Sequence, residues 1–404
     1  MISSMSAARP VLLTTFGYQR KVWIEPIEKL RDVFDVRYIH FTRAEEETVR
    51  NTSAPVYYWN EFTDAWMLLK TIKPDLILFF GLDSGMAIAL NFAAKKMNIP
   101  TIYLQHGLYS SFKDYRNIEK LTRIARRGQA AGLSPKRASS PRFIIDTFKK
   151  GNGYFSLLLT FIYIKLGGIL KSSYLAARLC PFRVRMPDHY ICFTHRNSLI
   201  HRQIDLIDEK QISYIGFPEM DVYFNTSANE SQQTPYLLLI DQPLSENTFG
   251  NIFTTIDNHV RFYEKVARFA HRQGCSLKIK LHPETYKATW LPDIEGVEYV
   301  RDVQQVEQLI LQASACVGFY STLIIPAIYF KPSLLFEHMP HSFYDFIKEH
   351  HVCPVVDYYN FNENDLVMSN EKGNRNNAFV HSFVPFSDGR SLQRLRDSVM
   401  NQLS

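Results

Sequence analysis

Short apolar runs that alternate with helical stretches constrain the fold of this 404-residue chain more than any other feature. In the first half the runs read VLLTTFG (11–17), FDVRYIH (34–40), DLILFFG (75–81), TIYLQHG (101–107), HYICFT (189–194) and ISYIGFP (212–218). Continuous apolar runs are typical of strands buried on both faces, which form parallel sheets covered by helices. The first half therefore predicts an α/β, Rossmann-like domain.

The same pattern returns after the polar stretch TSANESQQTP (226–235), which is typical of a linker. Five more runs follow it: YLLLID (236–241), SLKIKLHP (276–283), VEYVRD (297–302), ACVGFYS (315–321) and PSLLFE (332–337). The length suits two domains of about 150 to 200 residues each. The sequence thus predicts two Rossmann-like domains, residues 1–225 and 226–404, that face each other across a cleft.

Composition excludes several classes of protein. With 46% hydrophobic residues the chain can bury sizeable cores, so it is not a disordered protein. Its five cysteines are odd in number and form no CxxC pair, which favours neither a disulfide framework nor a zinc site. The N-terminal apolar run resembles a first buried strand more than a signal peptide, and we expect a cytoplasmic location.

Residues 108–187 carry the whole basic excess of the chain. They hold 16 Lys or Arg against 3 acids, a net +13, while the full chain is +6 and the remainder is therefore −7. Within them, residues 151–164 form an uncharged run of 14, short of the roughly 20 that span a bilayer. We expect a basic, amphipathic helical insertion in the first domain that attaches to an anionic membrane surface. The alternatives are a buried helix with a charged outer face and, least favoured, a nucleic-acid site, so we predict no nucleic-acid partner.

Polar residues follow several strands of the second domain, where open parallel sheets bind ligands. His282 and Pro283 end one predicted strand, and such a histidine can contact a phosphate. Ser321 and Thr322 are predicted at N-cap positions of the next helix, where backbone N–H groups bind anions. The predicted donor-binding residues are His282, Pro283, Gly318, Tyr320, Ser321, Thr322 and Glu337. Taken alone, His282 is better explained as a histidine that caps a strand, and Ser321 and Thr322 as a plain pair of helix-capping residues.

Three residues are candidates for a general base. Asp241 ends the first strand of the second domain, and Glu246 lies in the loop after it. His106, in the motif LQHG, ends a strand of the first domain. Any of these groups can take a proton from an acceptor hydroxyl, and the sequence leaves the choice open.

These motifs together carry a family resemblance. His282-Pro283, then GFYST (318–322), then KPSLLFE (331–337) resemble the GT-B glycosyltransferases of bacterial surface polysaccharides. QPLSEN (242–247) is similar to the lipooligosaccharide sialyltransferases. LQHG, KLHP and GFYST resemble the capsule Kdo transferases and the CDP-glycerol glycerophosphotransferases. The resemblance implies a GT-B fold and a cytidine-nucleotide donor.

The predicted function is therefore sugar transfer from a nucleotide-activated donor, of the CMP-sialic acid or CMP-Kdo type, to a glycan or lipid-linked acceptor in capsule or lipopolysaccharide synthesis. We expect inversion, no cofactor and, because the sequence has no Asp-x-Asp motif, no metal. The enzyme is expected at the inner face of the cytoplasmic membrane. The alternatives are a CDP-glycerol-type glycerophosphotransferase and a non-catalytic, glycan-binding protein with a GT-B shell.

Overall fold

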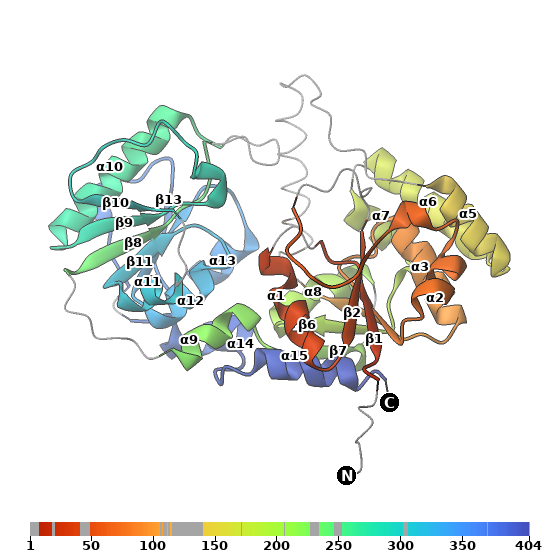
Figure 1. The fold of residues 1–404 in the computed structure, drawn as a ribbon. Helices are drawn as coiled ribbons and strands as arrows, with labels where there is room; N and C mark the ends of the chain where they lie inside the picture. Colours follow the sequence, from red (N-terminus) through yellow and green to blue (C-terminus); the bar gives the residue numbers. More distant parts are fainter. Residues whose placement is uncertain are drawn as a thin grey trace, which may run out of the picture. The chain divides into compact units, whose positions relative to one another are not determined.

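The computed structural model describes residues 8–17, 21–40, 49–105, 107, 111, 114, 140–170, 172–205, 207–226, 234–245, 253–301, 306–369 and 371–403. The chain divides into two compact units, each built on its own parallel sheet (Figure 1). Unit 1 comprises Met1–Gly107, Leu133–Pro218 and Arg390–Ser404, and unit 2 comprises Leu108–Gly132 and Glu219–Gly389. The predicted two-sheet α/β architecture is confirmed. Part of the basic segment, however, groups with unit 2, and the C-terminal residues return to unit 1.

Unit 1 contains a 7-stranded sheet in the order β3-β2-β1-β4-β5-β6-β7, with every pair parallel. Its strands are β1 (Val11–Thr14), β2 (Asp35–His40), β3 (Val56–Tyr58), β4 (Leu76–Phe79), β5 (Thr101–Leu104), β6 (His189–Cys192) and β7 (Ile212–Tyr214). All residues of β4 and β5 are buried, as continuous apolar runs require. The sequence did not predict β3, which is short and lies at the edge of the sheet.

The helices of unit 1 are α1 (Lys21–Glu28), α2 (Ala65–Ile72), α3 (Gly85–Lys96), α5 (Pro141–Lys150), α6 (Tyr154–Leu170), α7 (Ser173–Leu179), α8 (His195–Ile204) and α15 (Ser391–Met400). Helix α3 begins where the Ser84 side chain accepts a hydrogen bond from the Ala87 amide. It packs against α2, α5 and α6, and α5 also packs against α2. The basic segment thus supplies an outer helical layer, α5 to α7, on α2 and α3 (Figure 1).

The predicted amphipathic character of this layer holds for α5 alone. Helix α5 buries Phe143, Ile144 and Phe148 and exposes Arg142 and Lys149. Helix α6 departs from the prediction because it is apolar on nearly all sides and buries only Thr160 and Tyr163. No helix in the described part of the chain is long and apolar enough to cross a bilayer.

Unit 2 contains a 6-stranded parallel sheet in the order β10-β9-β8-β11-β12-β13. Its strands are β8 (Tyr236–Ile240), β9 (Ser276–Lys280), β10 (Val297–Val300), β11 (Ala315–Gly318), β12 (Ser333–Glu337) and β13 (Val355–Asp357). Its helices are α9 (Asp221–Asn225), α10 (Ile256–Arg272), α11 (Val306–Gln312), α12 (Ile324–Phe330), α13 (Ser342–Glu349) and α14 (Asn377–Phe383). The sequence predicted β8 to β12 and missed β13.

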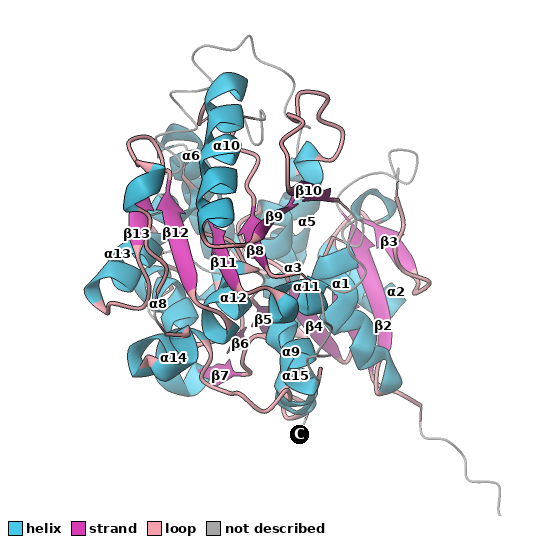
Figure 2. Cartoon of the chain, turned by 90° about the vertical axis from the view of Figure 1, so that its left-hand side faces the viewer, coloured by secondary structure: helices cyan, strands magenta, loops and turns pink. Residues whose placement is uncertain are grey.

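Helix α10 covers one face of the unit 2 sheet (Figure 2). Thr255 caps its first turn, since its side chain accepts from the Asn258 amide. The apolar residues of α10 then recur every three or four positions and pack on the strands. They are Phe262, Tyr263, Val266, Phe269 and Ala270, in contact with a core that includes Leu239, Ile279, Val317 and Phe336.

Both sheets reverse their strand order beside their first strand, as doubly wound sheets do. In unit 1 this point lies between β1 and β4, and there the rings of Phe16 and Phe80 meet edge to face with centroids 4.9 Å apart. In unit 2 it lies between β8 and β11, where polar side chains follow the strands. Because ligands bind at such points, the unit 2 edge is the better candidate for a site.

Candidate functional site

The strands at the centre of the unit 2 sheet approach each other closely because one residue lacks a side chain. A Cβ on Gly318, at the end of β11, would lie 2.8 Å from the carbonyl oxygen of Ile240 on β8. Real Cβ atoms do not make contacts that short, so only glycine fits here. Gly318 therefore sets how closely Asp241 and the turn after β11 lie together.

Asp241 follows β8 and is fully buried, with no exposed side-chain surface. Its Oδ2 accepts a hydrogen bond from the Tyr263 hydroxyl at 2.9 Å, and its Oδ1 lies 3.3 Å from His259 Nε2. Burial, and then the nearby carboxylate, raise the pKa of Tyr263 far above its usual value, so the hydroxyl stays protonated and donates. Both carboxylate oxygens of Asp241 thus have partners on α10.

The network continues from Asp241 toward the loop after β8. His259 is fully buried between rings of α10 and Trp290, and its Nδ1 lies 3.0 Å from Ser245 Oγ. If Nε2–H donates to Asp241, the Nδ1 lone pair accepts the Ser245 hydroxyl proton. Asp241, His259 and Ser245 therefore form a relay that fixes the direction of the serine hydroxyl.

His282 follows β9, next to β8, and is partly exposed. Its Nδ1 accepts a hydrogen bond of 3.3 Å from the Glu284 amide, while Pro283 starts a tight 3₁₀ turn over Pro283–Thr285. The neutral imidazole consequently carries its proton on Nε2, and this nitrogen is a hydrogen-bond donor. The proline thus fixes the turn that determines the tautomer of the histidine.

The turn after β11 differs from the prediction in one respect. Ser321 and Thr322 were predicted to cap the next helix, but α12 begins at Ile324, its N-cap is Leu323, and no side chain caps it. The two residues lie instead in the preceding turn, because the chain needs one more turn of backbone before it becomes helical. Within the described residues, the buried Oγ of Ser321 has no hydrogen-bond partner.

Both the backbone and the ring of Tyr320 contact neighbouring residues. Its amide donates to the Tyr344 hydroxyl at 3.0 Å, and that hydroxyl donates to the Phe336 carbonyl at 2.9 Å. The Tyr320 ring lies against His341, with centroids 4.0 Å apart. The position of the turn therefore depends on α13, which carries Tyr344.

Asp114 of the basic segment also belongs to this part of unit 2. Its carboxylate accepts from the Ser342 amide at 2.8 Å and from the hydroxyls of Ser342 and Ser111. Burial alone would raise the pKa of Asp114, but these hydrogen bonds hold this pKa below its usual value. Asp114 thus stabilises the first turn of α13, directly beside His341.

The remaining predicted residues are placed as follows. Glu337, at the end of β12, pairs with Lys348 of α13. His106 and Glu246 lie outside the described residues. Gln105, which precedes His106, is buried and accepts a hydrogen bond from the Phe193 amide through Oε1.

The geometry brings the predicted residues to one edge of the unit 2 sheet. Since β9 and β11 flank β8, the strand ends before His282 and Ser321 are about 10 Å apart, two strand spacings. Asp241 lies between them but faces inward, toward α10. Among the described residues no group of three or more His, Cys, Asp or Glu could hold a metal ion.

Sequence reasoning missed the residues that support this edge: Ser245, His259, Tyr263, Asp114, His341 and Tyr344. One signal was available, because His259 and Tyr263 are polar residues spaced four apart on the apolar face of a predicted helix. Polar groups at such positions need partners, and the nearest candidate was the acid that ends the first strand. Nothing in the sequence indicated the partner of Asp114.

Comparisons with known proteins agree with this architecture. A variant of the wall teichoic acid polymerase TagF, solved with CDPG, has a TM-score of 0.52 at 15% identity over 97% of this chain and 88% of its own. The UDP-GlcNAc 2-epimerase from Methanocaldococcus jannaschii has a TM-score of 0.52 at 14% identity, covering 98% of this chain and 99% of its own. At these identities the likeness supports the fold alone. A search of curated proteins finds no match.

The sequence itself matches the family model of the alpha-2,8-polysialyltransferases (POLYST) over residues 24–333. This range runs from within α1 to the first residue of β12, so it leaves out β1, and it includes His282, Ser321 and Asp241. The family match supports the predicted glycosyltransferase class, and the structural likeness agrees with the predicted GT-B fold. The chain therefore belongs to the alpha-2,8-polysialyltransferase family and is a glycosyltransferase with the GT-B fold.

Proposed function

We propose that this protein transfers a sugar of the sialic acid or Kdo type from its CMP-activated form to a glycan or lipid-linked acceptor. The family match supports a nucleotide-sugar donor. The product would contribute to a bacterial capsule or lipopolysaccharide, and the reaction would need neither metal nor cofactor. A lipid-linked acceptor would place the enzyme at the inner face of the cytoplasmic membrane.

The observation that carries this proposal is the position of His282 beside the central strand of unit 2. Its Nδ1 accepts from the Glu284 amide, so Nε2 carries the proton that a phosphate oxygen would accept. The orphaned Oγ of Ser321, on the other side of β8, is a second group that a bound ligand would satisfy. Both groups suit the donor phosphate.

The chemistry is a direct displacement. The acceptor hydroxyl oxygen bonds to the anomeric carbon as the bond from that carbon to the phosphate oxygen breaks, and CMP leaves with the electron pair. A general base takes the hydroxyl proton, and the His282 Nε2–H stabilises the charge that develops on the leaving phosphate. Attack opposite the leaving group inverts the anomeric centre.

Asp241 has a different part in this proposal from the one predicted. Its oxygens already bind Tyr263 and His259, and its side chain has no exposed surface. We assign it a positioning role, through His259, on Ser245. Glu246 and His106 then become the candidates for the base, to be separated by mutagenesis.

The test is a transfer assay with purified protein. CMP-sialic acid, CMP-Kdo and CDP-glycerol are each offered with a labelled oligosaccharide acceptor, in the presence of a chelator, and products are separated by chromatography. Transfer from a CMP-sugar alone supports the proposal. Transfer from CDP-glycerol alone would identify a glycerophosphotransferase, and a folded protein that binds glycans without transfer would be a non-catalytic binding protein.

Replacing His282 tests the proposed phosphate contact. We predict that His282→Ala lowers kcat by roughly 10²- to 10³-fold, as removal of one charge-stabilising donor does in other enzymes. His271→Ala is the matched control, because His271 is exposed at the opposite end of the unit, on the last turn of α10. Circular dichroism verifies that both variants fold. Equal turnover in the two variants would rule out this role for His282.

A further inference from the structure

Helix α6 exposes large apolar side chains to solvent. Phe155, Ile169 and Leu158 are 72%, 66% and 55% exposed, and Tyr154, Phe161, Ile162 and Ile164 are also exposed. Isolated exposed apolar residues are ordinary, whereas a contiguous group on one element marks an interaction surface. We call these seven residues the α6 face.

Most residues of the α6 face share one side of the helix. Each of residues 154, 155, 158, 161, 162 and 169 has another member of the set three, four or seven positions away, which places them along a stripe. The 17 residues of α6 extend about 25 Å at 1.5 Å each. The opposite side carries Thr160 and Tyr163, which are buried against the unit. The stripe is thus as long as the helix itself.

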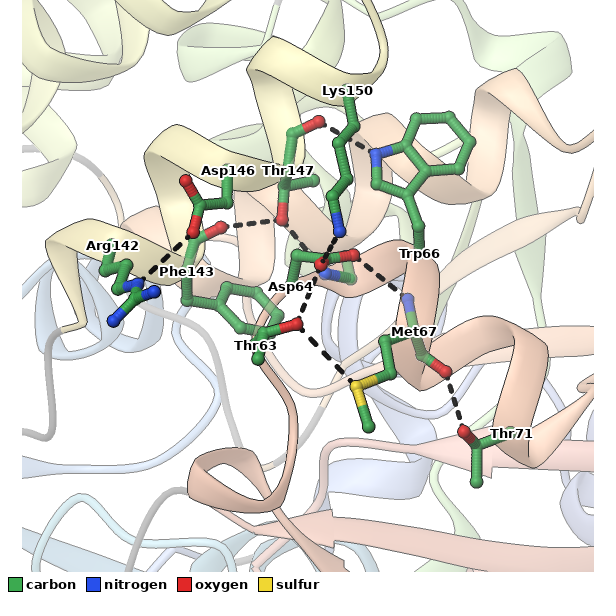
Figure 3. A network of polar contacts seen from close by, with 11 residues as sticks. Thr63, Asp64, Trp66, Met67, Thr71, Arg142, Phe143, Asp146, Thr147 and Lys150 are labelled. Carbon is green, nitrogen blue, oxygen red and sulfur yellow. Dashed lines mark hydrogen bonds and ion pairs between the residues drawn. The ribbon is translucent and has the colours of Figure 1, made fainter.

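The layer beneath the α6 face is firmly attached. Figure 3 shows polar contacts that join α5 to the start of α2, among them the pair of Lys150 with the buried carboxylate of Asp64. The Ala65 amide donates to Thr147 Oγ1 at 2.9 Å. Trp66 Nε1 also donates to the Thr147 carbonyl at 2.8 Å. The exposure of α6 therefore does not arise from a detached helix.

Glycines bring the start of α6 onto the same support. A Cβ on Gly153 would lie 2.4 Å from the Phe92 ring of α3, and one on Gly151 would lie 2.6 Å from it. The rings of Phe92 and Phe148 pack with centroids 4.6 Å apart. The turn from α5 into α6 is thus fixed against α3, and α6 has a fixed orientation in unit 1.

The charges on α6 and on the residues that follow it have one sign, and the acid on α5, Asp146, is paired with Arg142. Residues 151–187 contain no Asp or Glu, and they contain Lys165, Lys171, Arg178, Arg183 and Arg185. Lys165 is exposed on α6 itself, and Lys149 is exposed at the end of α5. Arg185 is buried against Asp205 and does not contribute. An apolar stripe with exposed lysines and no acids is complementary to an anionic lipid surface.

We propose that the α6 face docks on an anionic lipid bilayer, with the helix lying in the plane of the interface. Phe155, Leu158 and Ile169 enter the boundary of the acyl chains, and Lys149 and Lys165 contact the headgroups. Lipid docking by α6 adds to the proposed function. It rests on that function only in assuming that the acceptor is linked to a membrane. Lipid binding is measured without any donor, so the failure of one proposal is distinguishable from the failure of the other.

The experiment is flotation of the full chain with vesicles of phosphatidylcholine, with and without roughly 30 mol% phosphatidylglycerol. We expect the wild type to bind the anionic vesicles. The double variant Phe155→Ala/Ile169→Ala should bind them about 10- to 100-fold more weakly than the wild type, because two exposed apolar anchors are lost. The double variant Leu199→Ala/Val222→Ala, at exposed apolar positions outside α6, should bind like the wild type. The double variant Lys149→Ala/Lys165→Ala should bind anionic vesicles more weakly than the wild type, and its binding to vesicles of phosphatidylcholine only should be unchanged.

Two outcomes would overturn the proposal. One is a wild-type chain that does not float with anionic vesicles, including one that forms a dimer through α6 in solution. The other is a Phe155→Ala/Ile169→Ala variant that floats as well as the wild type. The rate of transfer to a soluble acceptor should be unchanged in this variant. This control separates a loss of lipid docking from a loss of catalytic activity.

Discussion

Helices α10 and α6 both have 17 residues, but they expose different kinds of side chain to solvent. Helix α10 buries its apolar side against the unit 2 sheet and exposes charged residues such as Asp257, Arg261 and Arg268. Helix α6 exposes apolar side chains on a layer that is already firmly packed. The fold of its own unit accounts for the apolar side of α10, whereas the unit leaves the apolar side chains of α6 exposed. The contrast separates a helix that supports the candidate donor edge from one that we propose to dock on a lipid surface.

The largest expected difference comes from truncating one apolar side chain on each helix. Phe262 of α10 is buried in contact with the rings of Phe319 and Phe336, while Leu158 is exposed on α6. We predict that Phe262→Ala costs about 3–5 kcal/mol of unfolding free energy, and that Leu158→Ala changes it by less than about 0.5 kcal/mol. Chemical denaturation measures both. Similar losses in the two variants would mean that α6 is part of a core.

A second prediction concerns the polar contact that α10 makes with β8. Tyr263→Phe keeps the ring and removes the hydroxyl that donates to Asp241 at 2.9 Å. A buried carboxylate that loses a donor is destabilised, and we expect a cost of about 1–3 kcal/mol in unfolding free energy. Tyr154→Phe, on the exposed α6 face, is the matched control and should have no measurable effect. An unchanged stability of Tyr263→Phe would show that the network is not structural.

The third prediction uses pH. Burial, and then the nearby His341, lower the pKa of His338 in the folded protein from 6.5 to about 4. Below about pH 6.5 the unfolded chain therefore binds a proton that the folded protein does not, and stability falls as the pH drops toward 4. Between about pH 7.5 and pH 5 this amounts to about 2 kcal/mol.

The measurement is the unfolding free energy of the wild type and of His338→Phe at both pH values. The variant should lose less stability on acidification, since it lacks the group that is protonated on unfolding. An equal loss in both proteins would show that other groups dominate the pH dependence of this region.

Much of the fold was predictable because local patterns decided it. Continuous apolar runs identified β1, β4 and β8, and three- to four-residue periodicity identified α3 and α10. The edge strands β3 and β13 escaped prediction, since each has three residues and only partial burial. Short edge strands depend on pairing with a neighbour, which the local sequence does not record.

The candidate site was predictable only in part. His282 and Gly318 lie at strand ends, and parallel topology alone brings strand ends to one edge. The burial of Asp241 depends on His259 and Tyr263, which are 18 and 22 residues away on a helix that packs across the strand. The contact of Asp114 with Ser342 spans 228 residues. Such contacts arise from tertiary packing and leave no local pattern.

The central claim, that the carboxyl edge of the unit 2 sheet binds a cytidine nucleotide, has a direct test. Thermal unfolding of the wild type is followed with CMP, CDP, UDP and GDP in turn. A ligand at about 100 times its dissociation constant adds about 2.7 kcal/mol to the stability of the folded state. We predict that CMP stabilises the wild type and that it stabilises His282→Ala less. Stabilisation by UDP or GDP and none by CMP or CDP would contradict it.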